Sequence, residues 1–351
     1  MSRGWVFYGW IVLVVLWPGA VSGQGTPLID SVCQAVQRQQ RQCQVHRVET
    51  ADGYRLSVHR IPAPQNRRCP QHLRPFLLMH GLLGSAGDFV SAGRGRSLAL
   101  ELHARCYDVW LGNARGTTHS RGHRTLQTSD ARFWQFSWHE IGIYDLPAIV
   151  DYVLARTNRR QLHYVGHSQG TTVLLVLLSQ RPEYNARFAN AALLAPVAFL
   201  QHLSSPPLRL LASDSSMATN ILPRILETTP AGISRGQLQH FGQLINSGKF
   251  QQYDYRSPRL NTQRYGQATP PSYQLANVRL QLQIFHGSRD ALSSLADVQR
   301  LVRELRNSVT QMYQVPGYNH IDFLFASSAP LVVFERIIQQ AWQLDVALAA
   351  L

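Results

Sequence analysis

The chain has 351 residues, of which 45% are hydrophobic and 15% are charged. This composition excludes a disordered, collagen-like or coiled-coil protein and allows one large buried core. The formal net charge is +14, and Lys249 is the only lysine among the 34 basic residues. This positive charge could serve binding to an anionic lipid surface or to a nucleic acid, or it could belong to a solvated surface without a partner. Because the arginines are scattered along the chain, we favour a solvated basic surface and expect no nucleic-acid partner.

The first residues have the pattern of a secretory signal peptide. Arg3 precedes a short apolar run from Trp5 to Trp17, and small residues such as Ser22 follow. The run is shorter than the roughly 20 apolar residues that span a bilayer, which argues against the alternative of a membrane anchor. We therefore expect residues 1–23 to be a cleaved leader and the protein to be secreted.

All the cysteines lie in the N-terminal third of the chain, at Cys33, Cys43, Cys69 and Cys106. In an oxidising compartment we expect two disulfides, and the sequence leaves all three complete pairings open. It also leaves open a buried free thiol, since Cys106 lies in a strand-like run. The spacing of the cysteines does not indicate a metal site.

From about residue 75, apolar β-rich runs alternate with segments of helical periodicity, which is typical of a parallel sheet covered by helices on both faces. In chain order we predict strands at Pro75 to Met79, Cys106 to Leu111, Leu162 to Val165, Ala191 to Leu194, Leu280 to Phe285 and Gln311 to Val315, and helices at Leu146 to Arg156, Thr171 to Gln180, Leu295 to Leu305 and Leu331 to Leu344.

The alternation stops between about Leu203 and Gln274, where Pro, Ser, Gln and Tyr accumulate. Such a composition favours an inserted segment that is mostly helical or irregular. We therefore expect a core made of residues 24–200 and 279–351, interrupted by a cap over residues 201–278.

The pentapeptide GHSQG (166–170) places Ser168 between a predicted strand and a predicted helix. A serine hydroxyl is a poor nucleophile, so it needs a base beside it, an acid to orient that base, and donors for the oxyanion. Gly166 and Gly170 permit the sharp strand-to-helix turn that carries the nucleophile in the α/β-hydrolase fold. The alternative is a structural turn without a catalytic role.

Two backbone N–H groups are candidates for the oxyanion hole. The first belongs to Gln169, which follows the nucleophile at a helix N-terminus. The second belongs to Leu82 in the sequence HGLLG (80–84), which follows the first predicted strand. The alternative for HGLLG is a glycine-containing strand exit with no such role.

The acid should follow the serine in chain order and lie at the carboxyl end of a later strand. Asp290 meets this requirement, because it follows the predicted strand that ends at Phe285. Asp297 is a weaker candidate because it falls on a predicted helix, and Asp322 comes after the candidate histidine.

The histidine should come last in the chain, in a loop after the final strand. Of 14 histidines, His320 alone follows the last predicted strand. His286 falls within or just after a strand, and His167 is expected to pack beside the nucleophile.

With these motifs the chain resembles the acid lipases, the family of gastric and lysosomal acid lipases and their insect relatives. The resemblance runs from about Val45 to Trp342 and rests on the segments ETADGYRLSVHRIP (49–62), LLMHGLLGSAGDFV (77–90), YDVWLGNARG (107–116), FWQFSWHEIGIYDLPAIVDYV (133–153), QLHYVGHSQGTT (161–172), TPAGISRGQLQHF (229–241) and YNHIDF (318–323).

The resemblance implies the α/β-hydrolase fold, a triad of Ser168, Asp290 and His320, and an oxyanion hole at Leu82 and Gln169. It also implies that long-chain esters, such as triacylglycerols or steryl esters, are the substrates. This chemistry needs no metal or organic cofactor, and we expect a monomer that contacts lipid at its surface.

The chain departs from the family in two ways. Between Leu203 and Ile221 it lacks much of the segment that carries the lid and a cap disulfide in relatives, and no cysteine follows Cys106. It also has no Asn-x-Ser/Thr sequon, which favours an extracellular over a lysosomal destination. A reduced lid supports the alternative of an esterase for smaller soluble esters, and a non-catalytic lipid-binding protein is the alternative from another class.

Overall fold

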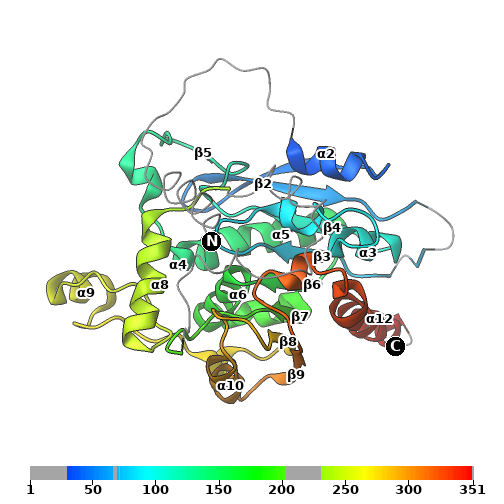
Figure 1. The fold of residues 1–351 in the computed structure, drawn as a ribbon. Coiled ribbons are helices and arrows are strands. Elements are labelled where there is room, and N and C mark those ends of the chain that lie inside the picture. The colour runs from blue at the N-terminus through cyan, green and yellow to red at the C-terminus, as the bar shows by residue number, and fades with distance from the viewer. Residues whose placement is uncertain (1–29, 66–68, 71, 203–230, 350–351) are drawn as a thin grey trace, which may run out of the picture. The chain divides into compact units, whose positions relative to one another are not determined.

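The computed structural model describes residues 30–65, 69–70, 72–202 and 231–349. From Ser31 onward these residues form a mostly parallel sheet with helices on both faces, so the predicted α/β-hydrolase fold is confirmed (Figure 1). The expected leader and residues 203–230 of the expected cap, including the shortened lid segment, lie outside the described residues.

The described part of the sheet has nine strands, of which eight follow the order β1-β2-β4-β3-β6-β7-β8-β9, while β5 pairs with β2. From β4 to β9 neighbouring strands are parallel, and β2 is antiparallel to its partners. Their bounds are β1 (Gln44–Glu49), β2 (Tyr54–Ile61), β3 (Phe76–Met79), β4 (Val109–Gly112), β5 (Gly122–His123), β6 (Leu162–His167), β7 (Phe188–Leu194), β8 (Gln281–Gly287) and β9 (Val309–Val315).

The six predicted strands correspond to β3, β4, β6, β7, β8 and β9. The hairpin of β1 and β2 at the sheet edge and the two-residue strand β5 were not predicted. Most side chains of β1 are exposed or half-buried, so this strand lacks the continuous apolar run that marks the buried parallel strands.

The described helices are α2 (Ser31–Gln37), α3 (Leu98–Ala104), α4 (Trp138–Glu140), α5 (Leu146–Thr157), α6 (Gln169–Gln180), α8 (Arg235–Ser247), α9 (Pro258–Tyr265), α10 (Leu295–Glu304), α11 (Asp322–Phe325) and α12 (Glu335–Ala349). Short 3-10 helices cover Ala86–Phe89, Ala131–Trp134, Pro182–Arg187 and Leu275–Asn277, and π-helical turns cover Ile141–Asp145 and Pro330–Phe334. The four predicted helices correspond to α5, α6, α10 and α12, whereas α2, α3 and the short helices α4 and α11 were not predicted.

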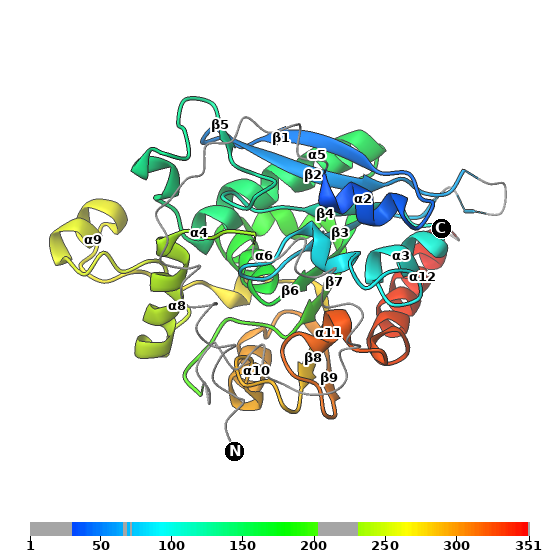
Figure 2. The same cartoon turned by 45° about the horizontal axis from the view of Figure 1, so that its top comes forward.

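Alternate side chains of each strand point to opposite faces of the sheet, which creates two apolar cores. Leu77 and Met79 of β3 pack in one core with residues of α5, α6 and α10. Phe76 and Leu78 of the same strand pack in the other core with residues of α2, α3 and α12. In both views α8 and α9, which belong to the expected cap, lie on the opposite side from α3 and α12 (Figures 1 and 2).

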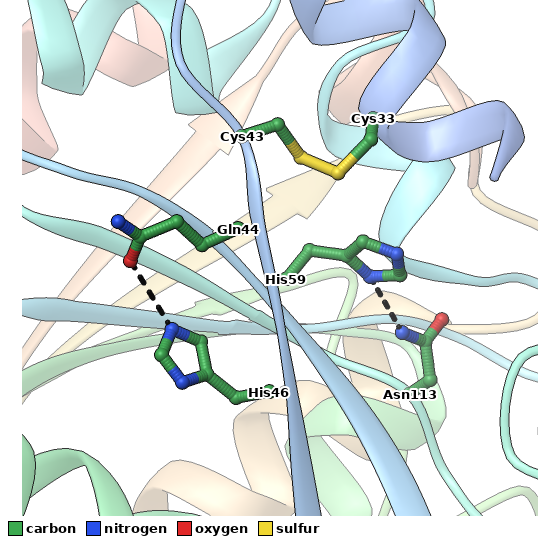
Figure 3. The surroundings of a disulfide bond; sticks show 6 residues. All are labelled: Cys33, Cys43, Gln44, His46, His59 and Asn113. Atoms are coloured by element: carbon green, nitrogen blue, oxygen red, sulfur yellow. Dashed lines mark hydrogen bonds between the residues drawn. A yellow bond between two sulfur atoms is a disulfide. The ribbon is translucent and has the colours of Figure 1, made fainter.

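Two disulfides join the four cysteines, as Cys33–Cys43 and Cys69–Cys106. The expectation of two bridges is confirmed, and the alternative of a free thiol at Cys106 is wrong. The first bridge ties α2 to the residue that precedes β1, and it lies near His59, which contacts Asn113 (Figure 3).

One group of potential metal-binding side chains occurs among the described residues, but it contains the sulfur of Cys33, which is already bonded to Cys43. This group therefore does not indicate a metal centre. None of the helices in the described ranges is long and apolar enough to cross a membrane.

Candidate active site

Ser168 lies on a sharp turn between the end of β6 and the start of α6. Its backbone has φ 52° and ψ −117°, a conformation that non-glycine residues rarely adopt. The turn is held because the Ser168 N–H donates a hydrogen bond to the carbonyl of Leu194 at the end of β7, at 2.9 Å. The strained backbone and its support from a neighbouring strand are typical of a nucleophile elbow.

The turn requires glycine on both sides of the serine. A Cβ atom at Gly166 would lie 2.7 Å from the carbonyl carbon and oxygen of Gly170. A Cβ atom at Gly170 would lie 2.2 Å from the carbonyl oxygen of Met79, at the end of β3. Since real Cβ atoms do not approach backbone so closely, strand, helix and neighbouring strand pack this tightly only without side chains.

The structure brings the three predicted polar residues together at the carboxyl ends of the strands. His320 Nε2 lies 2.7 Å from Ser168 Oγ, and His320 Nδ1 lies 2.9 Å from Asp290 Oδ2 and 3.1 Å from Oδ1. Asp290 follows β8, and His320 lies between β9 and α11. All three side chains are buried, so these hydrogen bonds form largely away from water.

The surroundings of Asp290 keep it ionised. Burial alone would raise its pKa, but the attraction of His320 and hydrogen bonds from His320 and from the N–H groups of Ser293 and Leu292 outweigh it, so its pKa is lowered. Both of these backbone groups donate to Asp290 Oδ1 at 2.9 Å. An ionised acceptor at Asp290 requires the proton of neutral His320 on Nδ1, which leaves Nε2 free to accept from the serine hydroxyl.

Gln169 is the first residue of α6, where backbone N–H groups have no partner within the helix. The loop HGLLG runs beside it: a Cβ atom on Gly81 would lie 3.0 Å from Ser168 Cβ and 3.0 Å from His167 Nδ1. The absence of a side chain at Gly81 therefore leaves the space next to the serine open. The two predicted oxyanion donors therefore come from different segments beside Ser168. Leu82 lies in the loop after β3, and Gln169 follows β6.

His80 controls the orientation of the peptide between Gly81 and Leu82. Its Nε2 accepts from the Ala114 N–H at 3.1 Å, so its proton is on Nδ1, which donates to the Gly81 carbonyl at 2.7 Å. Gly84 N–H donates to the same carbonyl at 3.1 Å. Because the C=O and N–H of a trans peptide point in opposite directions, fixing this carbonyl also fixes the direction of the Leu82 N–H.

His80 is buried, and burial lowers its pKa to about 4. His167, inside GHSQG, is also buried, and burial together with repulsion from His320 lowers its pKa to about 3. The Nε2–H of His167 donates to the backbone carbonyl of His320 at 2.7 Å. His167 therefore packs beside the triad candidates, as expected, and ties the loop of His320 to the serine turn.

The competing residues make other contacts and are not part of the Ser168–His320–Asp290 series. Asp297 is on α10 and accepts hydrogen bonds from His202, and His286 is within β8. Asp322 begins α11 and accepts from the Asn319 N–H at 2.8 Å.

Sequence reasoning missed the part that Gln237 takes in this region. Gln237 lies on α8, and its Nε2 donates to the side-chain Oε1 of Gln169 at 3.0 Å. The local signal was present, because Ser234 and Gln237 have the spacing of a helix capping box. The contact with Gln169 joins residues far apart in the chain, and no local pattern reports it.

Known proteins resemble this chain in fold and in sequence. Residues 32–93 match the family described as the partial alpha/beta-hydrolase lipase region, and residues 74–246 match the alpha/beta hydrolase fold. Two solved structures share the fold at low sequence identity. They are a monoacylglycerol lipase from Paleococcus ferrophilus (TM-score 0.53, 15% identity, 82% of this chain and 99% of that chain) and naproxen esterase from Bacillus subtilis (TM-score 0.54, 12% identity, 89% and 95%).

Curated relatives are more similar in sequence. Lipase 3 of Drosophila melanogaster is 36% identical, over 84% of this chain and 88% of the relative. Human gastric triacylglycerol lipase is 34% identical, over 84% and 86%. The resemblance to lipases found in the sequence motifs is confirmed: this chain belongs to the lipase family of the α/β-hydrolase fold and is a carboxylic ester hydrolase.

Proposed function

We propose that this protein is a lipase that cleaves long-chain lipid esters, such as triacylglycerols or steryl esters, through an acyl-enzyme on Ser168. The observation that carries the proposal is the hydrogen-bonded series Ser168–His320–Asp290, with distances of 2.7 Å and 2.9 Å. A hydroxyl, an imidazole and a carboxylate in this order and geometry support the roles of nucleophile, base and orienting acid in acyl transfer.

In the first half-reaction, Ser168 Oγ attacks the carbonyl carbon of the ester and His320 Nε2 takes the hydroxyl proton. The carbonyl oxygen becomes an oxyanion, which accepts hydrogen bonds from the N–H groups of Gln169 and Leu82. Asp290 stabilises the imidazolium that forms on His320. When the tetrahedral intermediate collapses, the alcohol leaves with the proton from His320, and the acyl group stays on Ser168.

In the second half-reaction, water attacks the acyl carbon and gives its proton to His320. The oxyanion forms again against the same two N–H groups. Its collapse breaks the bond to Ser168 Oγ, which recovers the proton from His320, and the fatty acid is released. The sum is hydrolysis of one ester bond by one water molecule, with no metal or organic cofactor in any step.

The test is a substrate profile of the purified protein beside Ser168→Ala. We expect the wild type to hydrolyse emulsified long-chain esters and to be inactivated by a serine-directed phosphonate, and Ser168→Ala to lose about 10⁴-fold or more in kcat. No turnover of any ester and no phosphonate adduct would overturn the proposal and favour a lipid-binding protein. A clear preference for monomeric short-chain esters would favour the esterase alternative.

We also propose that residues 1–23 are a cleaved leader, that residues 201–278 form a cap on the core, and that the protein acts outside the cell as a monomer at lipid–water interfaces. The two disulfides support this location, because such bridges persist in oxidising compartments. Expression with a C-terminal tag should yield protein in the medium with a new N-terminus near residue 23, and light scattering should report one chain per particle. Retention of the intact N-terminus inside the cell would contradict this.

A further inference from the structure

The segment Ala231–Gln237 contacts both sides of the proposed oxyanion hole. At one end, the Ala231 N–H donates to the carbonyl of Leu83 at 2.8 Å, next to the proposed donor Leu82. At the other end, Gln237 Nε2 donates to Gln169 Oε1 at 3.0 Å, on the residue that carries the other proposed donor. One short stretch of the cap region thus joins the loop after β3 to the start of α6, which follows β6.

The hydrogen bonds around Gln237 fix the direction of its amide. The Ser234 N–H donates to Gln237 Oε1 at 2.8 Å, so the amide NH₂ is turned toward Gln169. In return, Ser234 Oγ accepts from the Gln237 N–H at 3.2 Å. Gln237 and Gln169 are 3% and 2% exposed, so water does not compete for this contact.

The segment is itself held firmly against the core. Ser234 Oγ donates to the carbonyl of Phe136 at 2.6 Å. A Cβ atom on Gly236 would lie 2.3 Å from that same carbonyl oxygen, so α8 begins in direct contact with the backbone there. The Thr118 N–H donates to the carbonyl of Ala231 at 2.6 Å. A side chain anchored on such a segment can hold its partner in one position.

Gln169 is a residue whose position matters. Its N–H belongs to the peptide that follows Ser168, where the backbone has the rare φ of 52°. Such a conformation persists only when the surrounding structure holds it. An oxyanion donor is effective only if its N–H is already directed at the place where charge develops. A hydrogen bond that immobilises the Gln169 side chain limits the rotation of this residue at the start of α6.

We propose that Gln237 is a positioning residue for ester hydrolysis, which acts through the Gln169 side chain to keep the Gln169 N–H directed at the oxyanion. This inference rests on the proposed function, in which that N–H is one of the two donors. Gln237 does not touch the reacting atoms in this role, and its effect is transmitted by a single side-chain hydrogen bond.

Gln243 offers a matched control on the same helix. It is also a buried glutamine, and it makes two hydrogen bonds to Asp254: its Nε2 donates to the carbonyl at 2.8 Å, and its Oε1 accepts from the N–H at 2.8 Å. Both bonds lie within residues 231–278, and neither involves Gln169. Replacement of Gln243 therefore shows how much the loss of a buried glutamine on α8 affects activity when the contact with Gln169 is intact.

The experiment compares Gln237→Leu with Gln243→Leu on a soluble short-chain ester, so that binding to a lipid surface does not affect the rate. We expect Gln237→Leu to lose about tenfold in kcat with little change in KM, and to lose a similar factor in affinity for a trifluoromethyl ketone, which forms a tetrahedral adduct. Gln243→Leu should keep both values within about twofold of the wild type. Equal effects of the two variants, or an effect on KM alone, would overturn the inference.

A double-mutant cycle tests whether Gln237 acts through Gln169. Gln169→Leu keeps the backbone N–H but removes the acceptor, so the double variant Gln169→Leu/Gln237→Leu should lose no more in kcat than the more impaired single variant. Multiplied losses would contradict action through this bond. Phosphonate labelling and Ser168→Ala are measured in parallel: if they behave as proposed while the cycle is additive, only the role of Gln237 fails.

Discussion

Two buried histidine–aspartate pairs lie near opposite ends of β6. At the carboxyl end, His320 Nδ1 lies 2.9 Å from Asp290, beside Ser168. Near the amino end, Nε2 of His163 lies 3.1 Å from Asp345, which comes from α12. The two pairs have the same residue types, similar distances and similar burial.

The remaining partners separate the two pairs. His163 Nδ1 contacts Asn190 Oδ1 at 2.6 Å, and Asp345 also forms an ion pair with buried Arg74 at 2.6 Å. Both ring nitrogens of His163 and both oxygens of Asp345 therefore contact other parts of the fold. His320 instead directs its second nitrogen at a hydroxyl on a strained turn. A histidine–aspartate pair thus indicates chemistry only when a nucleophile occupies its third position, and otherwise it fastens elements together.

The largest expected effect is on the pair beside Ser168. Asp290→Asn should reduce kcat by about 10⁴-fold, because an amide in place of the carboxylate no longer favours the His320 tautomer with its proton on Nδ1. The free energy of unfolding should change by much less than the activation free energy that corresponds to this loss of kcat. Steady-state kinetics and urea unfolding measure the two quantities, and a variant that keeps most of its kcat would exclude Asp290 as the orienting acid.

The same substitution at the other pair should have the opposite profile. Asp345→Asn leaves buried Arg74 without its carboxylate partner, which should lower the free energy of unfolding by about 3–5 kcal/mol. The folded fraction should keep the kcat of the wild type, because His163 and Asp345 lie away from Ser168. If Asp345→Asn lowered kcat as much as Asp290→Asn does, the pair of His163 and Asp345 would also be needed for catalysis.

Much of the fold was readable from the sequence, because it depends on local patterns. The buried parallel strands are short apolar runs, and the elbow at Ser168 needs glycine on both sides of the serine. Asp290 and His320 could be selected by chain order, since both follow later strands at the same edge of the sheet. The edge strand β1 could not be predicted in this way, because its exposed side chains interrupt the apolar run.

The remaining features depend on contacts between distant parts of the chain. The pairing of Cys33 with Cys43, and of Cys69 with Cys106, follows from the packing of α2 and from the course of the chain before β3 and β4. The contact of Gln237 with Gln169 requires α8 to lie against the start of α6. Sequence spacing contains no information on such pairs, whereas it does contain the periodicity of a helix or strand.

A smaller effect on kcat is expected from replacement of His80. This residue orients a backbone group beside Ser168, and among the described residues the pair of His163 and Asp345 has no such group beside it. His80→Ala removes one of the two donors that fix the Gly81 carbonyl, so the Leu82 N–H should lose its alignment. We expect kcat to fall by up to about 10²-fold with KM little changed, which is less than for complete removal of an oxyanion donor. Partial rescue by His80→Asn, whose amide can donate near the position of Nδ1, is the control. A change in KM alone would assign His80 to substrate binding.

At neutral pH the smallest expected effect is that of His167, which changes only the pH dependence of stability. The pKa of His167 falls from 6.5 to about 3 on folding, so between these values the unfolded chain binds a proton that the folded chain does not. The contribution of His167 to stability should therefore fall as the pH drops below 6.5 and become constant below about 3. His167→Gln cannot titrate, yet its amide can still donate to the carbonyl of His320. Urea unfolding of the variant should show a slope shallower by about 1.4 kcal/mol per pH unit in this range, and an unchanged slope would mean that His167 is not held neutral beside His320.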